Sequence, residues 1–425
     1  MRIVKTRMPN LPYFEKDESY KILKDSNMRI AKVTERISYI GVNDRRTALF
    51  ENNWPIPYGV SYNSYIIKDE KNVLIDTVEY GSDGDFLCKI EACLNGGNLD
   101  YLVVNHMEPD HSGMIRSVLA KYPSVKVIGN AKTFELMGKY YGIPQESFLQ
   151  VADGQELNIG STSLKFYFIP WVHWPETMVT LDQADGVLFT CDAFGGYGSL
   201  DGGIFDSDYN MEEMFLPEMR RYYSNIVAKY NQMVTRAITK LADVPAKMIA
   251  PSHGVIWKEN PAKVIGLYSD WAASKAEEGV VIAYASMYGN TANLADQIGA
   301  KLAECGIKNI RTYDVSRTNV SYILSDIMRY KGFILGTCAY NTFMHPMMEH
   351  LCNELRIMGP KGKVMGIFGT SGWNGAGAKA LAKFAEEAKL TVVGPTVEAF
   401  GAPTAEKVNP SLEEFAAAFV QALKA

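Results

Sequence analysis

Residues 101–111 read Tyr-Leu-Val-Val-Asn-His-Met-Glu-Pro-Asp-His. The first five form a short apolar run of the kind that builds a buried strand. The next six contain four potential metal ligands, His106, Glu108, Asp110 and His111. Layered αβ folds place their sites where strands end. We therefore expect these four side chains to turn toward one point at the carboxyl end of the strand.

Three further candidate ligands each lie just past another predicted strand: His173 after residues 164–169, Asp192 after 187–191 and His253 after 247–250. Together with the run at 106–111 they supply four imidazoles and three carboxylates. Such a set can hold two metal ions with one carboxylate bridging them. A carboxylate-rich site without cysteine suits iron or manganese better than a thiolate site would, although zinc competes for the same ligands. The other two histidines, His345 and His350, point in different directions on a helix and are expected to be structural or exposed.

The first part of the chain mixes short strands with helices. Strands are predicted at 73–76, 101–105, 125–128, 164–169, 187–191 and 247–250, and helices at 112–121, 131–141 and 211–242. Each strand segment is rich in β-formers and is bounded by Gly, Pro, Asp or Asn. This mixture predicts a layered αβ fold for residues 1–274.

A polar stretch, Ser274 to Gly279, is expected to be a linker. After it, strand and helix alternate regularly. Strands are predicted at 280–285, 308–314, 332–336, 363–368 and 390–394, and helices at 291–304, 319–329, 346–358, 376–388 and 411–424. Five such repeats predict a doubly wound, five-stranded parallel sheet for residues 275–425.

The first of these strands leads into a loop and a helix that suit a phosphate group. The loop and helix start consist of Ser286, Met287, Tyr288, Gly289, Asn290 and Thr291. Backbone N–H groups at a helix start and nearby hydroxyls bind phosphate. The loop has no lysine of the nucleotide P-loop type, and Gly-x-Gly-x-x-Gly is absent. The pattern therefore favours the monophosphate of FMN over ATP or NAD, and it resembles the flavodoxin phosphate loop.

Two more loops are predicted on the same side of the sheet, after its third and fourth strands. They contain Thr337, Cys338, Ala339, Tyr340 and Asn341, and Thr370, Ser371, Gly372, Trp373, Asn374 and Gly375. Glycine lets the backbone approach a planar ring, and Tyr340 or Trp373 could stack on an isoalloxazine. In flavodoxins these two loops hold the flavin ring.

The composition excludes several classes of protein. The 425 residues carry a formal charge of −5, which gives no basic field for nucleic acid. No window is apolar enough for a membrane span, and residues 1–7 do not begin a signal peptide. The six cysteines form no Cys-x-x-Cys pair, so zinc ribbons and a disulfide framework are not expected. We expect a cytoplasmic protein.

The ligand run resembles the metallo-β-lactamase motif His-x-His-x-Asp-His, with Glu108 in place of the second histidine. That replacement is typical of the flavodiiron proteins, or A-type flavoproteins. The family spacing also matches, because 18 residues separate His173 from Asp192 and 60 separate Asp192 from His253. The resemblance implies an αββα sandwich of the metallo-β-lactamase type followed by a flavodoxin-like domain. It also implies that one iron is held by His106, Glu108 and His173, that the other is held by Asp110, His111 and His253, and that Asp192 bridges them as part of the catalytic centre.

The resemblance implies an oxidoreductase that reduces dioxygen to water, nitric oxide to nitrous oxide, or both. Electrons would pass from a separate donor, such as a rubredoxin, through FMN to the diiron site, since no rubredoxin segment follows residue 425. Family members pair head to tail, so a homodimer or a dimer of dimers is expected. The sequence does not decide between the two gases, and Tyr197 is a candidate gas-pocket residue. Two alternatives stay open: a zinc metallohydrolase with a flavodoxin-like appendage, and an electron carrier whose metal site is structural.

Overall fold

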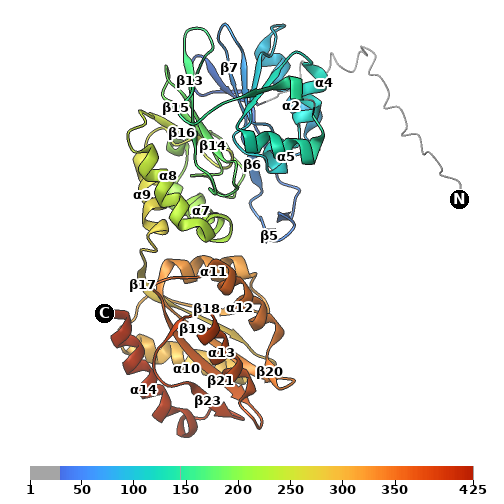
Figure 1. Ribbon diagram of the computed structural model, residues 1–425. Helices are drawn as coiled ribbons and strands as arrows, with labels where there is room; N and C mark the ends of the chain where they lie inside the picture. Colours follow the sequence, from blue (N-terminus) through green and yellow to red (C-terminus); the bar gives the residue numbers. More distant parts are fainter. Residues whose placement is uncertain (1–28, 144, 425) are drawn as a thin grey trace, which may run out of the picture.

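The computed structural model describes residues 29–143 and 145–424 and shows two layered halves stacked end to end (Figure 1). Residues 1–7, which we predict not to be a signal peptide, lie outside the described residues. Between the halves the chain passes from helix α9 (Pro261–Ala272) to strand β17 (Glu277–Ala285). Within the described residues, no helix combines the length and the apolar character needed to cross a membrane.

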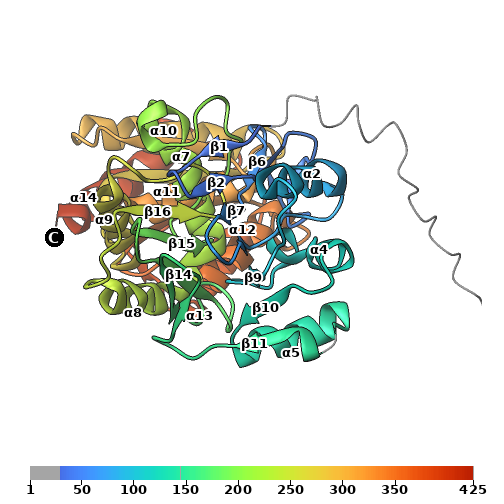
Figure 2. The same cartoon turned by 90° about the horizontal axis from the view of Figure 1, so that it is seen from above.

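The first half consists of two facing sheets with helices on both outer sides (Figure 2). One sheet has the order β1-β2-β7-β8-β9-β10-β11 and the other runs β12-β13-β14-β15-β16. The strands of the first sheet are β1 (Ala31–Lys32), β2 (Ile37–Tyr39), β7 (Tyr65–Ile67), β8 (Val73–Ile75), β9 (Tyr101–Val103), β10 (Lys126–Gly129) and β11 (Phe148–Gln150). Those of the second are β12 (Glu156–Asn158), β13 (Ser163–Phe168), β14 (Met178–Asp182), β15 (Val187–Cys191) and β16 (Met248–Pro251).

Helices close the sandwich on its two outer faces. Helices α2 (Asp83–Leu94), α4 (Ile115–Lys121) and α5 (Ala131–Tyr141) lie beside the first sheet, whereas α8 (Asn231–Leu241) and α9 lie beside the second (Figures 1 and 2). Strands β14 and β15 are buried at every residue, as expected for strands covered on both faces. The αββα prediction is therefore confirmed.

Several short elements connect these layers near the ends of the strands. They are β3 (Val42–Asp44), β4 (Leu49–Phe50), β5 (Trp54–Pro55), β6 (Val60–Tyr62), α3 (Pro109–Ser112) and α6 (Met211–Met214). Strand β3 pairs with β6, and β4 pairs with β5 in a small hairpin. Figure 1 shows this hairpin projecting from the sandwich toward the second half.

The second half is a doubly wound sheet, as predicted. Its parallel strands follow the order β18-β17-β19-β21-β22, with β18 (Ile310–Asp314), β19 (Tyr330–Tyr340), β21 (Val364–Ser371) and β22 (Thr391–Val392). Helices α10 (Asn290–Glu304) and α14 (Ala405–Lys424) share one apolar cluster, and α11 (Val320–Arg329), α12 (Pro346–Met358) and α13 (Ala376–Glu387) contribute to the other. The sheet is thus covered on both faces.

Four sequence predictions need correction in this half. Glu277 to Gly279 belong to β17 instead of a linker, and at Gly279 any side chain would collide with Tyr330. The fifth strand is split into β22 and β23 (Val397–Phe400), both paired with β21. Helix α14 begins at Ala405, before Pro410, and the buried Val408 packs its first turn into the apolar cluster. The second and third flavin loops begin later than predicted, since β19 and β21 continue to Tyr340 and Ser371.

The predicted helix at 211–242 is also wrong as a single element. It consists of α6, α7 (Leu216–Tyr222), a π-helical turn (Tyr223–Val227), a 3₁₀ turn (Ala228–Tyr230) and α8. The π-turn packs against α11 of the second half, where the Asn225 amide donates to the Ser321 carbonyl at 3.1 Å. Tertiary contact across the junction accounts for this break, which local helix propensity does not reveal.

The Arg221 side chain makes several contacts at this junction. Its guanidinium pairs with Glu218 at 2.5 Å and donates to the Ser321 hydroxyl at 3.0 Å. It also lies 4.5 Å from the ring centroid of Tyr197 and 4.4 Å from that of Tyr322. A fully buried arginine therefore joins the loop that carries Tyr197 to helix α11.

Candidate metal centre

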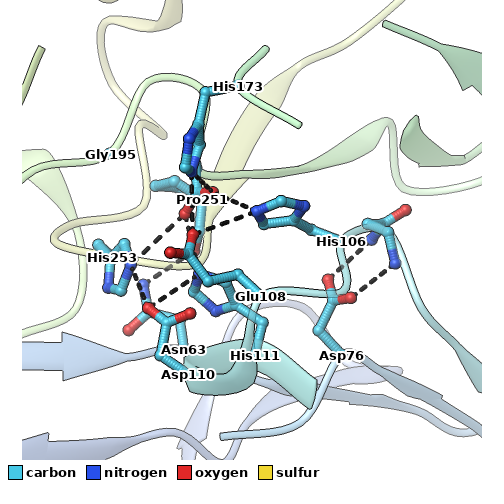
Figure 3. A network of polar contacts seen from close by, with 12 residues as sticks. Asn63, Asp76, His106, Glu108, Asp110, His111, His173, Gly195, Pro251 and His253 are labelled. Carbon is cyan, nitrogen blue, oxygen red and sulfur yellow. Dashed lines mark hydrogen bonds and ion pairs between the residues drawn. The ribbon is translucent and has the colours of Figure 1, made fainter. Parts of the chain in front are cut away.

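The seven candidate ligands lie together at the strand ends of the sandwich. Figure 3 labels six of them, all except Asp192. The first group holds His106, Glu108, His173 and Asp192, whose ligand atoms all lie within 4.8 Å of one another. In this group His173 Nε2 lies 2.9 Å from a Glu108 oxygen, and His106 Nε2 lies 3.3 Å from the same oxygen.

The second group holds Asp110, His111 and His253 within the same limit. One Asp110 oxygen lies 3.3 Å from His111 Nε2 and 3.2 Å from His253 Nε2. Asp192 lies between the two groups. Its Oδ2 is 3.2 Å from both His106 and His173, whereas its Oδ1 is 2.8 Å from His111. The two oxygens of one carboxylate thus face different groups, as a bridging ligand requires.

Local structure explains why these side chains converge. The run that begins at His106 leaves strand β9 and enters the short helix α3, which has Pro109 in its first turn and positions Asp110 and His111 on successive residues. Asp192 follows β15, where Cys191 adopts a left-handed backbone with φ 51°. His253 follows β16, which pairs in parallel with β15.

Hydrogen bonds orient two of the imidazoles. His106 Nδ1 lies 2.7 Å from Glu176 Oε1, and His253 Nδ1 lies 2.7 Å from the Ser61 carbonyl. A carboxylate or a carbonyl only accepts, so each Nδ1 carries the proton when the ring is neutral. Each Nε2 then directs a lone pair toward the centre of the site. This arrangement is how metal-binding histidines are usually held.

The charges in the site fit bound cations. Burial alone would lower the pKa of His111 and of His173, but adjacent carboxylates raise these pKa values to about 9 and about 10. Burial would raise the pKa of the Asp192 carboxyl, yet His111 and His106 hold it well below its usual range. Both oxygens of Asp110, as well as His253 Nε2, are buried and lack a hydrogen-bond partner. Without metal, protons on His111 and His173 counter the carboxylate charge, and metal ions would take the place of these protons, so the residues present fit two metal ions.

An aromatic wall closes one side of the second group. The rings of Phe50, Tyr62 and Tyr222 lie 5.5, 5.7 and 5.6 Å from the His253 ring. Tyr197 is fully buried and packs against Phe50 and Tyr222 at 5.4 and 5.1 Å. Tyr197, the candidate gas-pocket residue, is thus separated from His253 by the rings of Phe50 and Tyr222.

Sequence reasoning missed two carboxyl groups of the site. Glu176 holds His106 and also accepts from the backbone N–H of Met107, and its position three residues after His173 was the available signal. Glu51 is exposed as a residue, but its carboxyl end is turned inward toward Glu108. Desolvation of that carboxyl end and the Glu108 carboxylate raise its pKa to about 7. Nothing in the irregular segment around Glu51 marks it in the sequence.

The three predicted flavin loops lie side by side at the carboxyl ends of β17, β19 and β21. The parallel register pairs Ala285 with Thr337 and Thr337 with Gly369, so the strands reach the same edge. Helix α10 begins directly after Gly289, which has φ 89°. The Thr291 and Thr370 hydroxyls lie 2.8 Å apart, which links the first loop to the third. Thr291 is therefore buried and paired, unlike the open loop before it.

The same edge carries exposed aromatic side chains. Tyr288 is 91% exposed, Trp373 is 83% exposed and Tyr340 is 40% exposed. A side chain at Gly372 would meet no atom within 4 Å. A flat aromatic ligand such as isoalloxazine could approach the backbone at Gly372 and stack on one of these exposed rings. His345 caps helix α12 through its ring, and His350 is exposed on that helix, so neither belongs to the site.

Comparisons with known proteins agree with this architecture. Residues 60–254 match the ODP family beta lactamase model, and residues 282–415 match the flavodoxin model. An anaerobic nitric oxide reductase flavorubredoxin from Escherichia coli O1:K1 / APEC is 33% identical over 361 residues, covering 84% of this chain and 75% of the relative.

Solved structures show the same likeness across both halves. Rubredoxin oxygen:oxidoreductase from Desulfovibrio gigas superposes with a TM-score of 0.88 at 26% identity, covering 93% of this chain and 100% of its own. A substituted form of the flavo di-iron protein from Thermotoga maritima gives 0.85 at 29% identity, with 93% and 98% covered. Fold and site together define a metallo-β-lactamase-like domain joined to a flavodoxin-like domain. The chain belongs to the flavodiiron protein family.

Proposed function

We propose that this protein is a diiron flavoenzyme that reduces dioxygen to water, nitric oxide to nitrous oxide, or both. Its cofactors are FMN and two non-haem iron ions. The observation that carries the proposal is Asp192, whose two oxygens face the two ligand groups. The two relatives named above as reductases act on nitric oxide and on oxygen.

In this proposal each predicted ligand keeps its assigned place. His106, Glu108 and His173 would hold one iron, Asp110, His111 and His253 would hold the other, and Asp192 would bridge them. The iron pair supplies the redox chemistry that binds and reduces a diatomic gas. The protein's own part is to fix the ring planes through Glu176 and Ser61, and to exclude bulk water with the wall around His253.

Within one chain, the sheet of the second half separates the flavin loops from the ligand groups (Figure 1). Strand β17 begins at the junction with Glu277 and runs to Ala285, about 25 Å at the usual rise per residue. The flavin loops start where it ends, on the side of the sheet far from the sandwich (Figure 1). The two cofactor sites of one subunit are therefore far apart. This supports a head-to-tail homodimer, or a dimer of dimers, in which each flavin lies by the other subunit's irons.

Three further assignments belong to the proposal. The domain boundary lies at 274/275, between α9 and β17. The electron donor is a separate small protein of the rubredoxin type, as the name of the Desulfovibrio gigas structure suggests. The protein works in the cytoplasm, which its six free cysteines support because a reducing compartment keeps thiols unpaired.

The proposal is tested with protein loaded with iron and FMN and reduced anaerobically. Dioxygen and nitric oxide consumption are followed side by side for the wild type, His173→Ala and His350→Ala. We expect fast loss of at least one gas in the wild type and in His350→Ala, whose histidine is exposed on α12. His173→Ala should retain only slow free-flavin chemistry. Equal rates in all three proteins, or rapid lactam or thioester hydrolysis by the zinc-loaded protein, would contradict the proposal.

A further inference from the structure

A small cavity lies at the junction between the two halves, beside the segment where the chain crosses. Its volume is about 20 Å³, room for one water-sized species. From the first half it is lined by residues of α7, the π-turn, the 3₁₀ turn, α8 and α9, and by Ser274 just before β17. From the second half it is lined by Met328, Arg329 and Lys363. Figure 1 shows α7, α9 and β17 near the boundary between the two halves.

Three cationic side chains line this cavity: Arg220, Arg329 and Lys363. Lys363 is only 4% exposed, and the one bond found for its ammonium in the described chain goes to the Met328 carbonyl at 2.7 Å. The Nε atoms of Arg220 and Arg329 are buried and have no hydrogen-bond partner. Guanidinium and ammonium groups only donate, so the cavity has spare donors and needs an acceptor.

Nearby carboxylates balance this charge only in part, because Glu277 and Asp326 act on the two arginines and no carboxylate is paired with Lys363 in the described chain. Glu277 pairs with Arg329 at 2.9 Å and is half exposed. Asp326 accepts from the Tyr313 hydroxyl at 2.5 Å and faces Arg311 at 4.0 Å. Among residues 29–143 and 145–424, no ion pair is found for Arg220 or Lys363.

Burial disfavours the charge on two of the three cations, whereas Glu277 outweighs burial and raises the pKa of Arg329. Burial lowers the pKa of Lys363 to about 8, and burial together with the Arg329 charge lowers the pKa of Arg220. A buried cation without a counter-ion is strongly unfavourable. Water can solvate such a group but brings no opposite charge, whereas an anion supplies both acceptor capacity and charge.

We propose that this cavity binds one small monovalent anion of the halide class, held by Arg220, Arg329 and Lys363. The space, about that of one water molecule, favours a single-atom anion over phosphate or a carboxylate. Because Arg220 comes from the first half and Lys363 from the second, the anion is fully coordinated only when the halves keep this mutual orientation. The bound anion therefore stabilises the contact between the two halves where the chain crosses from one to the other. This role is independent of the redox reaction.

Bromide provides a direct test, because its anomalous scattering locates it in a crystal. Crystals of the complete protein in sodium bromide should show an anomalous peak in the cavity for the wild type and for Lys331→Met. Lys331 is a matched control, since its ammonium pairs with Glu278 at 2.7 Å outside the cavity. Lys363→Met and, independently, Arg220→Gln should lose the peak. A wild-type crystal without bromide in the cavity would overturn the proposal.

Thermal unfolding gives a second readout that does not depend on crystals. At constant ionic strength, replacing gluconate by chloride should raise the wild-type midpoint by roughly 1–2 °C once chloride exceeds its dissociation constant about tenfold. Lys331→Met should respond like the wild type, whereas Lys363→Met and Arg220→Gln should not respond. Equal midpoints in chloride and gluconate for the wild type, or a rise with sulfate alone, would refute the halide site.

Discussion

Replacing Glu176 by glutamine should weaken one iron position and leave the other unchanged. Glu176 Oε1 holds His106 Nδ1 at 2.7 Å, and the side chain is fully buried, so its charge acts on the imidazole with little screening. Glutamine keeps the shape but loses the charge that makes the ring a stronger ligand. Loss of such a partner typically costs 10–100-fold in metal affinity, or about 1.4–2.7 kcal/mol. His253 is held by the Ser61 carbonyl instead, so its group should lose nothing.

The assay is anaerobic titration of iron-loaded protein with a chelator while released iron is followed. We expect Glu176→Gln to release its first iron at 10–100-fold less chelator than the wild type and its second iron at the same chelator level. Glu135→Gln serves as control, because Glu135 is exposed on α5 and pairs only with two lysines in the described structure. A release curve for Glu176→Gln that coincides with the wild type would refute the reasoning. Equal weakening of both irons would show that the two groups are not independent.

Three further changes test the junction and the packing. Arg221→Met leaves the Glu218 carboxylate buried without its cation, so the free energy of unfolding in denaturant should fall by roughly 3–5 kcal/mol, and adding Glu218→Gln should recover most of it. Lys363 has a folded-state pKa of about 8, so between pH 8 and about 10.4 the unfolded chain binds its proton more tightly. In halide-free buffer the wild type should therefore gain up to roughly 3 kcal/mol of stability across that window, and Lys363→Met should not. Gly336→Ala places a methyl group against the Phe368 ring and should lower stability by roughly 1–3 kcal/mol.

Matched variants separate these effects from general damage. Lys331→Met should keep the wild-type pH profile, and Gly372→Ala should keep wild-type stability because its methyl group meets open space. An unchanged unfolding free energy in Arg221→Met, a parallel pH profile in Lys363→Met, or an unaltered melting temperature in Gly336→Ala would each contradict the corresponding prediction.

The fold class could be predicted from the sequence because the buried strands and helices of both halves follow regular apolar patterns. Strands β15 and β9 are continuous apolar runs bounded by polar turns, and the later strands alternate with amphipathic helices. The family spacing of the ligands also predicted that residues from His106 to His253, 147 positions apart, would lie together. The structure shows that the groups expected from the resemblance do lie together, with Asp192 between them.

Features that depend on contact between distant segments could not be predicted in this way. The break of the helix near Tyr223 follows from packing on α11, and the side chain of Arg221 bridges segments 100 residues apart. Glu51 reaches Glu108 from a hairpin that has no regular pattern. Periodicity describes which face of one element is buried. It carries no information about which partner that face meets, so junctions and wall residues need the three-dimensional structure.

Charge explains why such a site suits electron transfer better than hydrolysis. Glu108, Asp110 and Asp192 bring three negative charges to the centre of four imidazoles that are neutral when they bind metal. Two divalent ions then leave a centre close to neutral, which can lose electrons without building a large buried positive charge. A hydrolase gains from the opposite balance, because a more positive metal lowers the pKa of its bound water and polarises its substrate. The glutamate in place of a histidine therefore shifts the centre away from Lewis-acid chemistry and toward the cycling of electrons delivered by a flavin.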